Sequence, residues 1–193
     1  MRFIASLFAA LALVLTPAAA RPQPNESCQG LVASGTPRII PASLAADQVR
    51  LTFVGHATFL IESPAGVTIA TDYNDYVRPA VVPTVATMNQ AHSTHFSHRP
   101  DPGIAHVLRG WDPAGGIARH DLEVGDVRIR NVPTNIRDWN GGTRLHGNSI
   151  FVFEAADLCI AHLGHLHHTL TPEQLRELGR IDVVLVPVDG GYT

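Results

Sequence analysis

From Val49 onward the chain consists of short apolar or β-branched runs separated by glycine, proline and serine, and this pattern constrains the fold most strongly. Runs of this length and composition predict β-strands joined by tight turns. The predicted strands are Val49–Val54, Thr58–Glu62, Val67–Thr71, Thr84–Met88, Ala105–Leu108, Val127–Val132, Ser149–Glu154, Asp157–His162 and Ile181–Pro187. The last run is almost continuously apolar, which predicts a buried strand.

One helix is clearly marked near the end of the chain. Thr171–Gln174 places a hydroxyl at the N-cap, a proline at the first helical position and a glutamine at the third. Leu175 and Leu178 supply a core-facing stripe, and Gly179 supplies the stop. Strands therefore dominate the predicted fold and helices are few.

The N-terminus has the pattern of a secretory signal peptide. Arg2 precedes an apolar run over Phe3–Thr16, and the small residues Ala18–Ala20 follow a proline. The run is shorter than the ~18 residues that a membrane span needs. We expect residues 1–20 to be cleaved near Ala20 and the protein to be periplasmic or secreted, with an uncleaved anchor as the alternative. Residues 21–47 are expected to form an extended leader, and residues 48–193 a single domain.

Composition indicates a folded globular protein, and we expect its partner to be a small-molecule substrate rather than a nucleic acid. Hydrophobic residues make up 45% of the 193 residues, charged residues 16%, and the net charge is −3 without a block of like charge. These values argue against disorder and against a nucleic-acid surface. Cys28 lies in the leader and Cys159 in an apolar strand, so we expect the two cysteines not to form a disulfide, although an oxidising compartment would allow one.

The chain has 11 histidines, and seven of them fall within two short windows. The first window, NQAHSTHFSH, contains His92, His95 and His98, and the second, HLGHLHH, contains His162, His165, His167 and His168. Each window follows a predicted strand. Neutral imidazole is the commonest metal ligand in proteins, and these spacings let one loop present two nitrogens to one ion.

Clustered imidazoles favour a metal site on physical grounds. They repel one another when protonated and need polar partners when neutral and buried, and a divalent cation meets both requirements. The alternative is a pair of polar surface loops with incidental histidines. His167 and His168 are expected to be exposed or to support the ligands from outside.

Two further residues stand at strand ends. His56 lies in the turn Gly55–Thr58 and is either a structural histidine or a ligand or catalytic contact. Asp72 either orients a ligand histidine or caps a turn. The chain has no G-x-S-x-G, phosphate-binding glycine loop or C-x-x-C motif, so nothing indicates a serine nucleophile.

The order of these segments resembles the metallo-β-lactamase fold superfamily. LTFVGHATFLIE, a strand ending at Asp72, a His-rich loop, a strand entering H-L-G, and TPEQL follow one another over residues 49–193. The chain looks closest to the branch of ascorbate-phosphate lactonases and related metal-dependent hydrolases. The resemblance implies an α/β fold, an αβ/βα sandwich rich in strands, with a metal site at the strand ends.

The family's first ligand motif, T-H-x-H-x-D-H, is best matched by residues 89–95. In that register His92 and His95 are ligands, Gln90 replaces the first histidine, and Thr94 replaces the catalytic aspartate. A rival register starts at Thr94 and uses His98 instead.

The second family motif, H-x-G-D, is matched by His162–His165. His162 keeps its ligand role, and His165 replaces the bridging aspartate. In the family a final histidine follows the segment at which this chain ends, Gly190–Thr193. We expect the closing C-terminal elements to be missing from a fragment, with a native protein that lacks the last ligand as the alternative.

The resemblance implies an exported zinc-type hydrolase. One or two Zn²⁺ ions, or Mn²⁺ as in the lactonase branch, would activate hydroxide against an ester, lactone, amide or phosphodiester. Because the family's carboxylates are absent, the general base is open between His56, His98 and the hydroxide itself. The alternative is a catalytically degenerate periplasmic metal-binding protein on the same fold.

Overall fold

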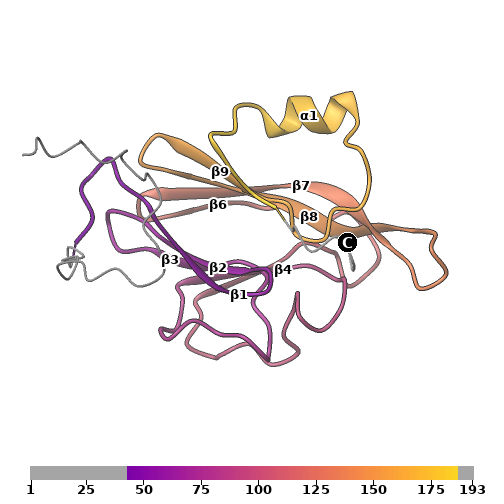
Figure 1. Ribbon diagram of the computed structural model, residues 1–193, viewed down its shortest axis with the longest axis horizontal. Helices are drawn as coiled ribbons and strands as arrows, with labels where there is room; N and C mark the ends of the chain where they lie inside the picture. Colours follow the sequence, from indigo (N-terminus) through magenta and orange to yellow (C-terminus); the bar gives the residue numbers. More distant parts are fainter. Residues whose placement is uncertain (1–42, 187–193) are drawn as a thin grey trace, which may run out of the picture. The chain divides into compact units, whose positions relative to one another are not determined.

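Two β-sheets make up most of the domain in the computed structural model, which describes residues 43–186 (Figure 1). The first sheet has the order β1-β2-β3-β4-β5, in which β1 pairs with β2 and β2 with β3 in antiparallel fashion, whereas β3, β4 and β5 are parallel. Its strands are β1 (Arg50–Gly55), β2 (Thr58–Glu62), β3 (Thr68–Ala70), β4 (Val85–Met88) and β5 (His106–Arg109).

The second sheet has the order β10-β9-β8-β7-β6 and is antiparallel except for the pair β9 and β10. That parallel pair is connected through the helix α1 (Pro172–Leu178), as a parallel crossover requires. The strands are β6 (Asp121–Val124), β7 (Val127–Arg137), β8 (Thr143–Ala155), β9 (Leu158–His162) and β10 (Val183–Leu185).

The main core lies between the inner faces of the two sheets. Both sheets contribute fully buried aliphatic and aromatic side chains to it, among them Ile61, Ile69 and Val85 from the first sheet and Ile129, Phe151, Phe153 and Ile160 from the second. The outer face of the second sheet is covered by α1, whose Leu178 belongs to a cluster with Val132, Ile150 and Val152. The outer face of the first sheet is covered by loops, with Met88 and Tyr73 at the centre of the contact.

Each predicted strand is present, but some details of the prediction were wrong. β7 and β8 are longer than predicted, and β6 was not predicted, because its four residues carry charges at two positions. Leu175 is 55% exposed, so the helix contributes only Leu178 to the core. In the predicted buried strand Ile181–Pro187, Val184 and Val186 are about half exposed, because β10 is an edge strand within the described part of the sheet.

Several predictions fall outside residues 43–186. The predicted signal peptide, most of the leader, Cys28 and the C-terminal segment Gly190–Thr193 are among them. Cys159, within the described range, is half-buried and has a free thiol. Between residues 43 and 186 no helix combines the length and apolar character that crossing a membrane requires.

Hydrogen bonds at both ends hold the seven-residue helix α1. Thr171 Oγ1 accepts from the Gln174 backbone N–H at 3.2 Å, and Gln174 Oε1 accepts from the Thr171 backbone N–H at 3.0 Å. The Gln174 amide also donates to the Pro133 carbonyl on β7. At the other end Arg130 donates to the carbonyls of Glu177 and Leu178. A helix this short depends on such contacts because its own nucleation is unfavourable.

Replacing Thr171 with alanine removes the N-cap acceptor, and we expect it to lower the free energy of unfolding by about 1 kcal/mol. Urea denaturation followed by circular dichroism measures the change. Thr169→Ala is the control, because Thr169 is exposed and lies two residues before the cap. Equal stabilities of the two variants would contradict a role for the capping box.

Candidate metal centre

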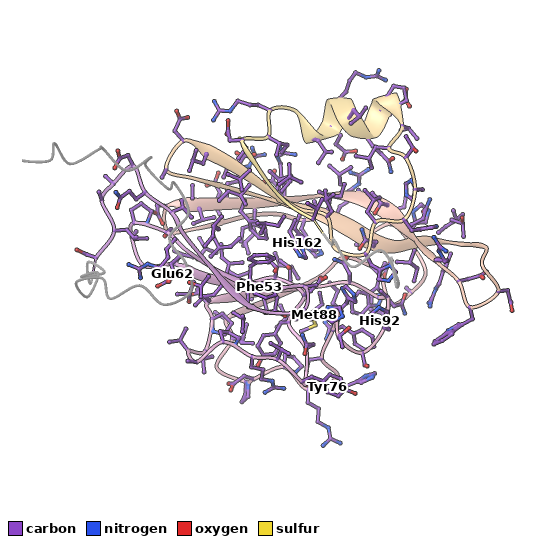
Figure 2. All side chains as sticks on the ribbon, viewed as in Figure 1. Phe53, Glu62, Tyr76, Met88, His92 and His162 are labelled. Carbon is purple, nitrogen blue, oxygen red and sulfur yellow. The ribbon has the colours of Figure 1, made fainter. Side chains whose placement is uncertain are left out.

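The histidine rings of two loops come together in the structure. His92 and His95 lie in the loop after β4, with ring centroids 4.5 Å apart. The ring of His165, from the loop after β9, lies 5.1 Å from His92 and 5.0 Å from His95, edge-on to both. Figure 2 labels His92 and, at the end of β9, His162. Residues 70 positions apart in sequence therefore meet at one site.

The turn between β1 and β2 adds a fourth imidazole. The ring of His56 lies 5.2 Å from His95 and 5.8 Å from His92. One potential ligand atom from each of His56, His92 and His95 lies within 4.8 Å of the other two. A cation of ordinary coordination distance fits such a group.

His95 is oriented by a buried carboxylate. Its Nδ1–H donates to Asp72 Oδ2 at 2.5 Å, and both side chains are almost completely buried. Asn89 donates to the other oxygen of Asp72 at 3.0 Å. Burial alone would raise the pKa of Asp72, but attraction to His95 and His162 and these hydrogen bonds hold it below its usual range. A bond at Nδ1 leaves Nε2 as the atom of His95 that could bind a metal ion.

His92 is kept neutral by its surroundings. Burial lowers the pKa of His92 to about 4, and repulsion from His95, His165 and His56 adds to the effect. Thr94 Oγ1 lies 2.8 Å from His92 Nδ1 and 3.1 Å from His56 Nε2, so one hydroxyl joins both rings. A metal ligand must be a deprotonated imidazole, and His92 meets this condition well below neutral pH.

His162 ends β9 and is buried. Its ring forms a hydrogen bond with the Ala57 backbone, and burial lowers its pKa. Nδ1 is buried without a hydrogen-bond partner in the described structure, so the bond to Ala57 uses Nε2. Burying a ring nitrogen without a hydrogen-bond partner costs free energy unless a cation binds it. The buried Nδ1 of His162 therefore fits the role of a metal ligand. The residues present therefore fit a metal ion.

The remaining predicted residues lie apart from this group. His98 is exposed, its ring packs on Phe96 at 4.9 Å, and its backbone N–H points to Asp75. The structure thus brings His92 and His95 together with His165 and leaves His98 outside this group. His167 and His168 hydrogen-bond to the backbone of Asn135 instead.

Two asparagines that sequence reasoning missed hold the ligand loops in place. Asn89 accepts from the Ser149 backbone N–H on β8 at 2.8 Å, besides its bond to Asp72. Asn148 Oδ1 accepts from the backbone N–H of His165 at 2.8 Å. Gly164 lies between the two amides, where a Cβ would be 2.3 Å from Asn89 Nδ2 and 2.5 Å from Asn148 Oδ1. An asparagine after a strand carries no sequence signal that distinguishes this role.

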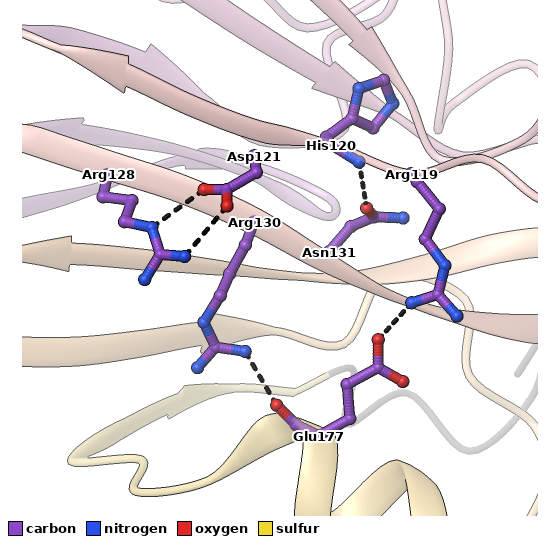
Figure 3. Close-up of a pocket in the computed structure, with 7 residues that line it drawn as sticks. All are labelled: Arg119, His120, Asp121, Arg128, Arg130, Asn131 and Glu177. Carbon is purple, nitrogen blue, oxygen red and sulfur yellow. Dashed lines mark hydrogen bonds and ion pairs between the residues drawn. The ribbon is translucent and has the colours of Figure 1, made fainter.

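A separate pocket between the second sheet and α1 contains no part of the histidine group (Figure 3). Its arginines are engaged by carboxylates. Arg128 binds Asp121 through two nitrogens at 2.8 and 3.0 Å, and Arg119 pairs with Glu177. The Arg128–Asp121 pair joins β7 to β6, and the Arg119–Glu177 pair joins the segment before β6 to α1, so these charges have a structural role.

Comparisons with known proteins agree with this geometry. The family model of the beta-lactamase superfamily domain matches residues 50–193. The chain is similar to a Thermotoga maritima protein assigned to the Zn-dependent hydrolases of the metallo-β-lactamase superfamily, with 35% identity and a TM-score of 0.54 over 76% of this chain and 64% of that one. A metal-dependent hydrolase from Parabacteroides distasonis ATCC 8503 has 15% identity and a TM-score of 0.57, over 75% of this chain and 72% of that one. The search of curated proteins found no match.

These matches confirm the predicted fold and superfamily. The Parabacteroides protein shows the fold alone, and the chain spans 64% of the length of the Thermotoga protein. Neither likeness distinguishes the lactonase-like branch, which stays a prediction.

Gly164→Ala tests how tightly the ligand loops are joined. Gly164 has φ +60° and no room for a Cβ, so we expect the variant to lose about 2 kcal/mol of unfolding free energy and to bind zinc more weakly. Gly141→Ala is the matched control, because Gly141 has φ +80° but nothing within 4 Å of a Cβ. Similar losses in both variants would mean that backbone strain, not the crowded amides, sets the cost.

Because the pKa of His92 is lowered, we expect the chelator-treated protein to become less stable as the pH falls. As pH falls, the unfolded chain takes up a proton near the ordinary value of 6.5, whereas folded His92 does so only near 4. The unfolding free energy should therefore decline across this interval. Urea denaturation at several pH values should show a shallower decline in His92→Asn, and identical declines would argue against the assignment.

Proposed function

Since this chain belongs to the metallo-β-lactamase superfamily, we propose that it is a metal-dependent hydrolase whose ion is held by His92, His95 and His165. The observation that carries the proposal is the meeting of these three rings, 4.5 to 5.1 Å apart, with His95 fixed by buried Asp72. The buried Nδ1 of His162 supports a fourth ligand position close to Asp72.

The donor set favours a borderline cation. Imidazole nitrogens suit Zn²⁺ and other late transition metals, whereas Mg²⁺ and Ca²⁺ prefer oxygen ligands. Such a cation, when bound, lowers the pKa of a coordinated water and polarises the bond under attack. We propose zinc, with manganese as the alternative that the lactonase-like branch suggests.

The chain's own residues supply orientation. Asp72 holds the Nδ1 proton of His95 and so directs its Nε2 to the ion. Thr94, at the position of the family aspartate, contacts His56 and His92 through its hydroxyl. A hydroxyl does not accept a proton at neutral pH as a carboxylate does, so Thr94 serves to position imidazoles rather than to act as a base.

The substrate is proposed by class only, as an ester, lactone, amide or phosphodiester. We also propose export, on the signal-like pattern of residues 1–20. The exchange of two family carboxylates for Thr94 and His165 favours one specific alternative, a metal-binding protein on this fold without hydrolytic activity.

Hydrolysis that depends on metal tests the proposal. The full chain is purified, its metal content is measured by elemental analysis, and lactone, aryl ester and bis-aryl phosphate substrates are assayed. We expect turnover of at least one substrate class that a chelator abolishes and zinc restores.

His95→Ala should lower both zinc content and turnover, because it removes a buried ligand that Asp72 orients. Stoichiometric metal with no turnover across the panel would favour the metal-binding alternative. Absence of bound metal would overturn both functions.

A further inference from the structure

We infer that His56 is a metal ligand, contributed by the β1–β2 turn, so that the ion is bound by imidazoles from three separate segments. The inference rests on the proposed metal site, but it changes the role of His56, which the sequence left open between a structural residue, a ligand and a catalytic base. It also goes beyond the two ligand loops, because neither contains His56.

The ring positions fit coordination of one ion. Zinc–imidazole bonds of about 2 Å in a tetrahedral site place the ring centroids of two ligands roughly 5 Å apart. His56 lies 5.2 Å from His95 and 5.8 Å from His92, and His92 lies 4.5 Å from His95. Ligand atoms of these three residues also lie within 4.8 Å of one another.

The turn that carries His56 is fixed in place. The Ala57 carbonyl accepts a hydrogen bond from Thr71 Oγ1 at 3.0 Å, and the buried ring of His162 also bonds to the Ala57 backbone. The adjacent Thr58 hydroxyl donates to the carbonyl of Asp72. The two residues that follow His56 are therefore anchored, Ala57 to the ring of His162 and Thr58 to Asp72, whose side chain orients His95.

The backbone at His56 points to a role for its side chain. His56 has φ +52° in a two-residue turn between β1 and β2, a conformation for which glycine, asparagine and aspartate are preferred. A histidine at such a position is uncommon, and residues held in this region often serve a functional site. The ring separations above identify that site.

Thr94 makes a ligand nitrogen available on both rings. Its Oγ1 can accept from His92 Nδ1–H and from His56 Nε2–H, the two atoms it contacts. In those tautomers the ring nitrogens that carry no proton are Nε2 of His92 and Nδ1 of His56. One hydroxyl thus sets the tautomers of two ligands, as carboxylates commonly do for metal-binding histidines.

The consequence is a site with neutral nitrogen ligands. Asp72 is the carboxylate that contacts the histidine group in the described structure, and both its oxygens are already engaged by His95 and Asn89. Without a carboxylate to bridge two ions, a single ion is favoured, and it belongs to the class of zinc, cobalt and nickel rather than magnesium or calcium.

His56→Asn tests the inference, because asparagine tolerates the positive φ and offers no imidazole. Zinc affinity of the full chain is measured by competition with a chromophoric chelator, and X-ray absorption counts the imidazoles around zinc. We expect a loss of affinity of at least about tenfold and one imidazole fewer than in the unsubstituted protein. His106→Asn on β5, at the far edge of the same sheet, is the control and should change neither.

Each result decides between the roles. Unchanged zinc affinity and imidazole count in His56→Asn would overturn the inference, and a fall in kcat alone would assign His56 as a base instead. If His56→Asn does not fold, His56→Gly repeats the measurement, because glycine adopts the positive φ without strain, with thermal unfolding of the zinc-free protein as the check. A site that binds zinc through His56 but hydrolyses no substrate would refute the proposed function and leave the inference standing.

Discussion

The hydrogen bonds of Asn89 are the interaction on which the geometry of the site depends. One amide, at the end of β4 and completely buried, accepts from the Ser149 N–H on the opposite sheet and donates to Asp72. Its own backbone N–H donates to the His95 carbonyl and closes the first ligand loop. Asn89 therefore fixes three things at once, namely the distance between the sheets, the position of the Asp72 carboxylate and the conformation of the loop. A shift in any one of them would move His95.

This arrangement explains how the fold keeps His92 and His162 uncharged in a group of neighbouring imidazoles. Burial and mutual repulsion both disfavour the charged form, and they lower the pKa of His92 and of His162. Asp72 offsets part of the cost through its attraction to His95 and His162, because it remains ionised at low pH. Neutral His92 and His162 beside one ionised carboxylate are surroundings that favour the binding of a cation.

The sequence predicted the local features well. β2 agrees to the residue, the Thr171 cap is present, and the preferred register brought His92 and His95 together. These features depend on short spacings. The contacts of His56, Asn89 and Asn148 depend on segments far apart in the chain, and nothing in their neighbours marks them. The prediction that Leu175 faces the core was wrong for a related reason. In a helix of seven residues, the spacing of two leucines does not show which of them faces the sheet.

Thr94 and His165, which the resemblance places where the family has carboxylates, both contact the ring of His92 in the structure. Thr94 has no carboxylate with which to bind a cation, and its hydroxyl forms hydrogen bonds with the rings of His56 and His92 instead. His165, at the position of the other aspartate, packs edge-on against His92 and His95. In the register that the resemblance gives, each residue stands where the family has a carboxylate and contacts imidazole instead. The proposed site would therefore depend on nitrogen donors, with Asp72 acting through His95 rather than on the ion.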